Sequence, residues 1–277
     1  MDLKTVCLAM IADRETVADS AIAYAVSMAE QAGAHLSCRL APAELDLPSA
    51  RVLPMVQALV DEVNAERLAA ARDLQARIET AARLAGVTCD CDILAGRYLE
   101  AREKAVAGAR ASDLVVLPQA RGALSSETGL IEAILFGCGR PAIVVPDGWA
   151  KGAAPKRVVV AWDGGGRAAR AVGDALPLLA RADSVEIVCV TEGGASDLAG
   201  SDIARHLSRH CRELNLLELQ VTHDDAGRTL LDHLAGSGQT DLLVMGAFAH
   251  SRLFQLVLGG VTSAMLEQAR LPVLYSF

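Results

Sequence analysis

Short apolar runs alternate along the chain with longer segments whose apolar residues recur at helical spacing. The apolar runs predict strands at residues 5–11, 35–41, 87–94, 114–117, 142–145, 157–161, 185–190, 218–222, 242–245 and 273–275. The longer segments predict helices at residues 17–31, 54–85, 99–111, 130–136, 167–181, 202–214, 229–235 and 262–269. This alternation is typical of an α/β fold, in which a parallel sheet is covered by helices.

The order of elements starts again after a segment rich in proline, glycine and alanine at residues 146–155. Matching residues support a repeat, because Asp13 and Asp163 both follow the first strand of their half. We therefore predict two tandem domains, at residues 1–149 and 150–277. Each is expected to be an open, five-stranded parallel sheet, and right-handed crossovers place helices on both of its faces.

Composition narrows the class of protein. The chain has 277 residues, of which 52% are hydrophobic and 22% charged, so it can bury a sizeable core. Its net charge of −8 argues against a broad nucleic-acid footprint, and charges interrupt every apolar run before it could span a membrane. The first residues show no secretory signal and the seven cysteines are scattered, which predicts a reducing, cytoplasmic location.

Candidate chemistry is sought after the strands, since ligands bind outside the carboxyl ends of a parallel sheet. Gly246 ends a strand and allows close backbone approach, and Gly259 and Gly260 open the next helix with free N–H groups suited to phosphate. His250 and Arg252 could add charge-assisted bonds to the same anion. Tight turns alone would explain the glycines equally well, so both interpretations remain open at this point.

The segment that begins at Gly246 resembles the nucleotide loop of the universal stress protein family, whose pattern is G-x2-G-x9-G-[S/T] after the fourth strand. In this chain the pattern falls on Gly246, Ala249, Gly259 and Gly260. Ala249 replaces a glycine and Gly260 replaces a hydroxyl-bearing residue. The resemblance extends over nearly the whole chain, because both halves have the five-strand order of the family.

The resemblance implies an adenine nucleotide alpha hydrolase-like, or Rossmann-like, fold and a stress-response regulator that binds ATP or a related adenine nucleotide in the C-terminal domain. It places a carboxylate against the nucleoside and an apolar residue against the adenine or ribose. The resemblance also allows a magnesium ion bound together with the nucleotide. The expected nucleotide-binding residues are Ala161, Trp162, Asp163, Val190, Met245, Gly246, Ala249, His250, Arg252, Gly259, Gly260, Val261 and Thr262.

No catalytic or metal-binding residue is assigned, so we expect no enzyme, or at most slow ATP hydrolysis. The alternative is a nucleotide-free scaffold or interaction module of the same fold. The family also implies that the final strands of the two halves pair, which gives an intramolecular pseudo-dimer with a further homodimer as an option. Protein partners are not specified by the sequence, and neither nucleic acid nor membrane is expected.

The first half departs further from the family pattern. Pro118 and Arg121 stand at the two glycine positions of the loop, and Thr128 and Gly129 stand at the helix opening. Proline cannot donate an N–H group, and the loop is shorter than its counterpart. We therefore expect no nucleotide in the N-terminal domain.

Two other motifs compete in the second half. Gly164 and Gly166 fit a G-x-G-x-x-A dinucleotide fingerprint with Glu192 as the ribose acceptor, but the spacing to the acid is longer than usual. His206 and His210 lie four residues apart on a predicted helix, which suits either a metal or a solvated helix face.

One cysteine motif stands in the first half. Cys89 and Cys91 are separated by one residue, so on a strand both thiols would share a face. No second cysteine pair or matched histidine pair completes a metal site, and buried packing is the favoured interpretation.

Overall fold

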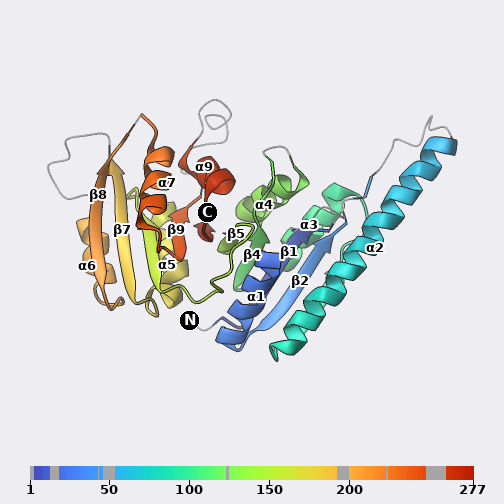
Figure 1. The fold of residues 1–277 in the computed structure, drawn as a ribbon, viewed down its shortest axis with the longest axis horizontal. Helices are drawn as coiled ribbons and strands as arrows, with labels where there is room; N and C mark the ends of the chain where they lie inside the picture. Colours follow the sequence, from blue (N-terminus) through green and yellow to red (C-terminus); the bar gives the residue numbers. More distant parts are fainter. Residues whose placement is uncertain are drawn as a thin grey trace. The chain divides into compact units, whose positions relative to one another are not determined.

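A computed structural model describes residues 3–12, 19–42, 44–45, 54–122, 125–191, 200–222, 224–247 and 260–277 (Figure 1). Its internal contacts divide the chain into an N-terminal unit, Leu3–Arg140, and a C-terminal unit, Pro141–Phe277. Both units are built from strands that alternate with helices, so the predicted α/β class is confirmed.

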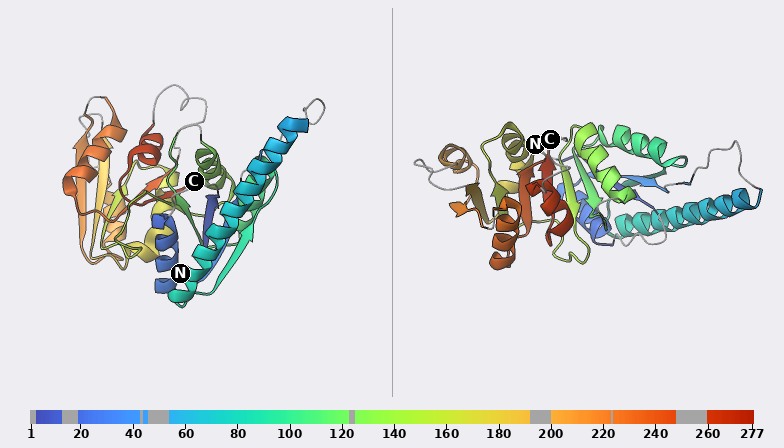
Figure 2. Two further views of the ribbon diagram at one scale, coloured as in Figure 1. Left: turned by 45° about the vertical axis from the view of Figure 1, so that its right-hand side comes forward. Right: turned by 90° about the horizontal axis from the view of Figure 1, so that it is seen from above.

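The N-terminal unit has four parallel strands in the order β3-β2-β1-β4. They are β1 (Thr5–Ile11), β2 (His35–Ala41), β3 (Cys89–Ile93) and β4 (Leu114–Pro118). Helices α1 (Asp19–Ala32) and α2 (Pro54–Leu84) pack on one face of this sheet, and α3 (Tyr98–Ala109) and α4 (Ser126–Gly137) on the other (Figure 2).

The C-terminal unit has six strands in the order β5-β10-β9-β6-β7-β8. They are β5 (Ala142–Val145), β6 (Arg157–Ala161), β7 (Ser184–Thr191), β8 (Leu214–Gln220), β9 (Leu242–Gly246) and β10 (Val273–Ser276). Its helices are α5 (Gly166–Leu179), α6 (Ser201–Leu207), α7 (Ala226–Ser237) and α9 (Val261–Gln268). Helix α5 packs against β9 and β10, and α7 packs against α9.

All neighbouring strands of the N-terminal unit are parallel, and those of the C-terminal unit are parallel with one exception. Strands β5 and β10 are antiparallel, with Ala142 beside Tyr275 and Val144 beside Val273. The predicted pairing of the two final strands is therefore confirmed. Each of these strands is short and apolar, and pairing satisfies backbone groups that would otherwise lie at an exposed edge.

The central strands are buried on both faces, which explains their continuous apolar sequences. All five residues of β4 are buried, and so are Val158–Val160 of β6 and Leu242–Met245 of β9. A strand covered by helices on both faces has no wet side, so it does not alternate between apolar and polar residues. Among the described residues, no helix is both long enough and apolar enough to cross a membrane.

The predicted helix at 202–214 and the strand at 218–222 are wrong in their bounds. Helix α6 ends at Leu207, where the amide groups of His210 and Cys211 turn back to the Leu207 carbonyl. Strand β8 then begins at Leu214, which lies beside Val185 of β7. Pairing with β7 makes the chain extended from Leu214 onward, four residues before the predicted start of the strand.

The start of α4 was also placed too late by the sequence pattern, at residue 130 instead of Ser126. Ser125 is the N-cap of this helix, and its side chain accepts a hydrogen bond from the Thr128 amide at 3.2 Å. A serine cap satisfies one of the free N–H groups at a helix start. The polar first turn therefore belongs to the helix although it adds nothing to the apolar stripe.

The buried side chain of Tyr275 carries an unsatisfied polar group. Tyr275 is fully buried in β10, and its hydroxyl has no hydrogen-bond partner among the described residues. Burial raises the pKa of this phenol well above its ordinary value, so the group stays protonated. A buried hydroxyl that makes no hydrogen bond costs stability.

We expect Tyr275→Phe to raise the free energy of unfolding by about 1 kcal/mol, because it removes the unsatisfied group while keeping the ring. Tyr98→Phe is the matched control. The Tyr98 hydroxyl donates to the Ser126 carbonyl at 2.8 Å, so its loss should lower the free energy by about 1 kcal/mol. Urea denaturation measures both variants, and a destabilised Tyr275→Phe protein would contradict the assignment.

Candidate functional site

The strand order of the C-terminal unit has one point where the chain changes direction across the sheet. From β6 the chain moves outward to β7 and β8, whereas β9 lies on the opposite side of β6 and leads to β10. In open parallel sheets the crevice at such a switch point, outside the carboxyl ends of the strands, is the usual ligand site. Here it lies where β6 and β9 end.

Asp163 lies in the turn that connects β6 to α5. Its Oδ1 accepts a hydrogen bond from the Gly165 amide at 2.7 Å, and Gly164 adopts a φ of +75° that favours glycine. The second carboxylate oxygen, Oδ2, has no partner among the described residues, and the side chain is exposed. Oδ1 therefore stabilises the turn, and Oδ2 is free to accept a hydrogen bond from a ligand.

Gly246 ends β9 directly beneath the start of α5. An added Cβ there would lie 2.7 Å from the amide nitrogen of Ala168 and 2.9 Å from the Cβ of Arg167. Neither neighbour can move without shifting the helix, so packing alone requires a glycine at this position. The role that sequence reasoning gives to Gly246, close approach to a phosphate, is therefore not needed to explain it.

Other predicted residues come from the ends of neighbouring strands. Ala161 ends β6, Val190 lies next to the end of β7, and both are half-buried. Trp162 is half-buried and donates its amide to the Val188 carbonyl at 2.9 Å. Met245 is buried inside β9. Because β6 is parallel to both β7 and β9, these positions lie together at the carboxyl ends of the strands.

The start of α9 differs from the start of its counterpart α4. Gly260 is the N-cap of α9 and supplies no side-chain bond, and an added Cβ there would meet no atom within 4 Å. Val261 is half-buried and Thr262 buried in the first turn. In α4 the Ser125 side chain already occupies the helix start. The first-turn N–H groups of α9 are thus not capped by a side chain of their own N-cap residue.

Sequence reasoning missed Arg167, in the first turn of α5. Its guanidinium lies over the Phe277 ring, 4.0 Å from the centroid, and its buried Nη1 has no hydrogen-bond partner among the described residues. A cation at a helix start is disfavoured by the helix dipole. That mismatch between residue and position is the signal that could have revealed it.

Several predicted residues cannot be placed. Ala249, His250, Arg252 and Gly259 lie outside the described residues. The same is true of Asp13 and of Glu192, the acid of the dinucleotide fingerprint. Their roles stay predictions.

The competing metal pair is not arranged as the sequence suggested. His206 lies in α6, but His210 lies beyond the end of that helix, and the two rings are 5.0 Å apart between centroids. Both side chains are exposed. In the part of the chain that the structure describes, no group of three or more histidine, cysteine or acidic side chains could hold a metal ion.

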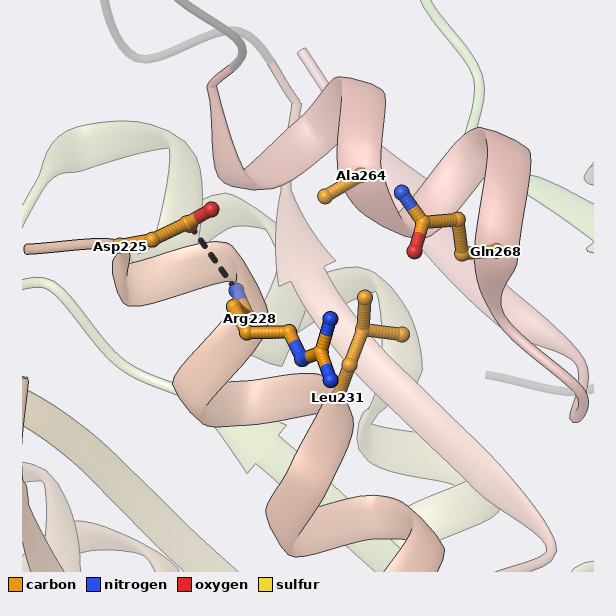
Figure 3. Close-up of a pocket in the computed structure, with 5 residues that line it drawn as sticks. All are labelled: Asp225, Arg228, Leu231, Ala264 and Gln268. Atoms are coloured by element: carbon orange, nitrogen blue, oxygen red, sulfur yellow. Dashed lines mark hydrogen bonds between the residues drawn. The ribbon is translucent and has the colours of Figure 1, made fainter. Parts of the chain in front are cut away.

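A groove of about 440 Å³ lies between α7 and α9, lined by Asp225, Arg228, Leu231, Ala264 and Gln268 (Figure 3). None of the predicted nucleotide-binding residues lines it. Its charged groups already have partners, because the Asp225 side chain accepts from the Arg228 amide at 2.9 Å and the Arg228 Nε contacts Asp232 at 3.1 Å. Both charged side chains that line the groove are thus engaged within α7, and the carboxyl ends of β6 and β9 remain the stronger candidate.

Comparison with known proteins bears on the same unit. Residues 155–275 match the sequence model of the universal stress protein family. This part of the chain is a universal stress protein domain. No curated protein matches the chain in sequence.

Solved structures extend the likeness to the whole chain. A universal stress protein from Archaeoglobus fulgidus DSM 4304 is 13% identical and aligns over 98% of this chain and 95% of its own, with a TM-score of 0.74. A functionally unknown protein from Pseudomonas aeruginosa PAO1 is 13% identical and aligns over 99% of this chain and 92% of its own, with a TM-score of 0.56. At this identity the likeness shows a shared fold.

The packing role of Gly246 can be tested without any ligand. We expect Gly246→Ala to lower the free energy of unfolding by about 1–3 kcal/mol, because the new methyl group would overlap the α5 backbone. Gly173→Ala is the control, since a Cβ there meets nothing within 4 Å inside α5, and helix propensity should raise stability by about 1 kcal/mol. Unchanged stability of Gly246→Ala in denaturant would contradict the packing role.

Proposed function

We propose that the C-terminal universal stress protein domain binds ATP or a related adenine nucleotide at the carboxyl ends of β6 and β9. Through that occupancy the protein acts as a stress-response regulator. The observation that carries the proposal is that Gly260, the N-cap of α9, supplies no side-chain cap, whereas the Ser125 side chain caps α4. An uncapped helix start offers N–H donors and a positive dipole end to a phosphate.

The phosphate end of the ligand is assigned to the first turn of α9. Because no atom of the described residues lies within 4 Å of a Cβ at Gly260, a phosphate oxygen could approach the backbone there. The predicted cations His250 and Arg252 belong to the segment that leads into this turn. Backbone donors replace the hydroxyl that the family pattern has at this position.

The nucleoside end is assigned to the turn after β6. The free Oδ2 of Asp163 can accept a hydrogen bond from a ribose or base donor. Trp162, which follows β6, and Val190, near the end of β7, supply apolar surface. The guanidinium of Arg167, whose Nη1 has no hydrogen-bond partner among the described residues, adds positive charge beside Gly246. A polyanionic ligand would relieve the mismatch between this cation and the helix dipole.

The N-terminal unit is proposed to bind no nucleotide. Its strand β4 ends at Pro118, which has no amide proton to donate, and the Ser125 side chain fills the helix start that a phosphate would need. The Tyr98 hydroxyl also lies against Gly129, in the space that a Cβ there would need. The proposal is one of binding with at most slow hydrolysis, because the assigned groups position a ligand and none is assigned as a general base.

Substituting Gly260 tests the phosphate assignment. Gly260→Asp should weaken ATP binding by about 30-fold or more, because the new carboxylate would cap the N–H groups and repel phosphate. Its backbone is extended and its surroundings are open, so the fold should be kept. Gly260→Ala, which adds neither a capping oxygen nor a charge, should bind as tightly as the wild type. Calorimetric titration with ATP measures both variants.

The two halves supply matched controls. Asp163→Ala should weaken binding, whereas Asp13→Ala and Ser125→Ala should leave it unchanged. Gly129→Val is not a suitable control, because its side chain would collide with Tyr98. Equal affinity of the wild type and Gly260→Asp would contradict the site. A wild type that takes up no nucleotide would favour the scaffold interpretation.

A further inference from the structure

Three cysteines lie together in the N-terminal unit. Cys38 belongs to β2, and Cys89 and Cys91 belong to the neighbouring strand β3, with Cys38 beside Cys91 and Leu36 beside Cys89 in the parallel register. This confirms that Cys89 and Cys91 share a face of the sheet. The Sγ atoms of Cys38 and Cys89 are 3.9 Å apart, and Cys38 is completely buried.

The three cysteines differ in how far solvent can reach them. Helix α2 packs over this face of β2 and β3 (Figure 1). Its Gln75 side chain donates to the Cys91 carbonyl at 3.3 Å. Cys89 and Cys91 are nevertheless half-exposed, because β3 ends the strand order of the unit and lies at its edge. An oxidant in solution can therefore reach Cys89, whereas Cys38 is reached only through its neighbour.

The sulfur contact also activates the exposed thiol. A hydrogen bond from Cys38 lowers the pKa of Cys89, in opposition to burial and to the nearby acids Asp90 and Glu79. The same contact and burial raise the pKa of Cys38. Elsewhere in the unit, burial raises the pKa of Cys7 to about 12 and also raises that of Cys138. The thiolate is the reactive form of cysteine, so Cys89 is favoured as the nucleophile.

We propose that Cys38 and Cys89 form a peroxide-sensitive thiol pair that closes to a disulfide. The Cys89 thiolate attacks a hydroperoxide, breaks its O–O bond and becomes a sulfenic acid, while the peroxide is reduced to hydroxide or alkoxide. The Cys38 sulfur then displaces the sulfenic oxygen and forms the S–S bond. The proton of Cys38 leaves with that oxygen as water.

The geometry allows this closure with a small movement. The two sulfurs must approach from 3.9 Å to about 2.0 Å. Among the described strands β3 is hydrogen-bonded only to β2, so it can shift toward its neighbour without breaking a second ladder. The bond would tie the edge strand of the unit to its interior.

Peroxide treatment of the full chain, followed by intact mass and tryptic mapping under non-reducing conditions, tests the proposal. The wild type should lose the mass of two hydrogen atoms, and the peptide that ends at Arg39 should become linked to the peptide that ends at Arg97. Cys89→Ser should abolish the link. Cys38→Ser should abolish it as well and leave Cys89 as a sulfenic acid that dimedone traps.

Two control variants complete the experiment. Cys211→Ser removes a half-buried thiol in the C-terminal unit and should keep the link, and so should Cys91→Ser. A link that survives Cys89→Ser and disappears in Cys91→Ser would overturn the assignment of Cys89. A wild type that forms no link and traps no dimedone at Cys89 would overturn the thiol pair itself. Neither readout depends on nucleotide binding.

Discussion

Burial of the central strands on both faces is the constraint on which the rest of the structure depends. All of β4, Val158–Val160 of β6 and Leu242–Met245 of β9 are buried, so these strands expose no polar face between their ends. Polar groups that act on a ligand can then be offered only where strands end and helices begin. Close packing at those ends follows from the same constraint, and Gly246 illustrates it, since the start of α5 leaves no room there for even a methyl group.

The two halves of the chain meet this constraint differently. In the N-terminal unit Ser125 caps α4 and Tyr98 lies against Gly129, so the helix start is closed by the protein itself. In the C-terminal unit the N-cap residue of α9, Gly260, supplies no side-chain cap, and Asp163 keeps one carboxylate oxygen without a partner among the described residues. The proposed nucleotide site and the proposed thiol pair therefore belong to different units. One half of the duplication is assigned to ligand binding, and the other carries a cysteine cluster under α2.

Much of the fold could be predicted from the sequence, because strands buried on both faces leave an unmistakable apolar signal. The bounds of β1, β2, β5 and β6 agree with the predictions to the residue. The predicted helix runs past Leu207 and the predicted strand begins later than Leu214, because the turn after α6 and the pairing of β8 with β7 leave no periodic signal in the sequence. The ends of β6 and β9 could be predicted as a site from topology. The contact of Arg167 with Phe277 joins residues far apart in the sequence, so no local pattern could reveal it.

The central claim is that a nucleotide occupies the end of the C-terminal sheet and leaves the N-terminal unit empty. Residue-resolved amide hydrogen exchange of the full chain, recorded with and without saturating ATP, tests it most directly. We expect added protection at the amides of Gly260, Val261 and Thr262 and in the turn that holds Asp163, and none at Thr128 or Gly129. Equal protection at the starts of α4 and α9, or protection at α4 alone, would contradict the account.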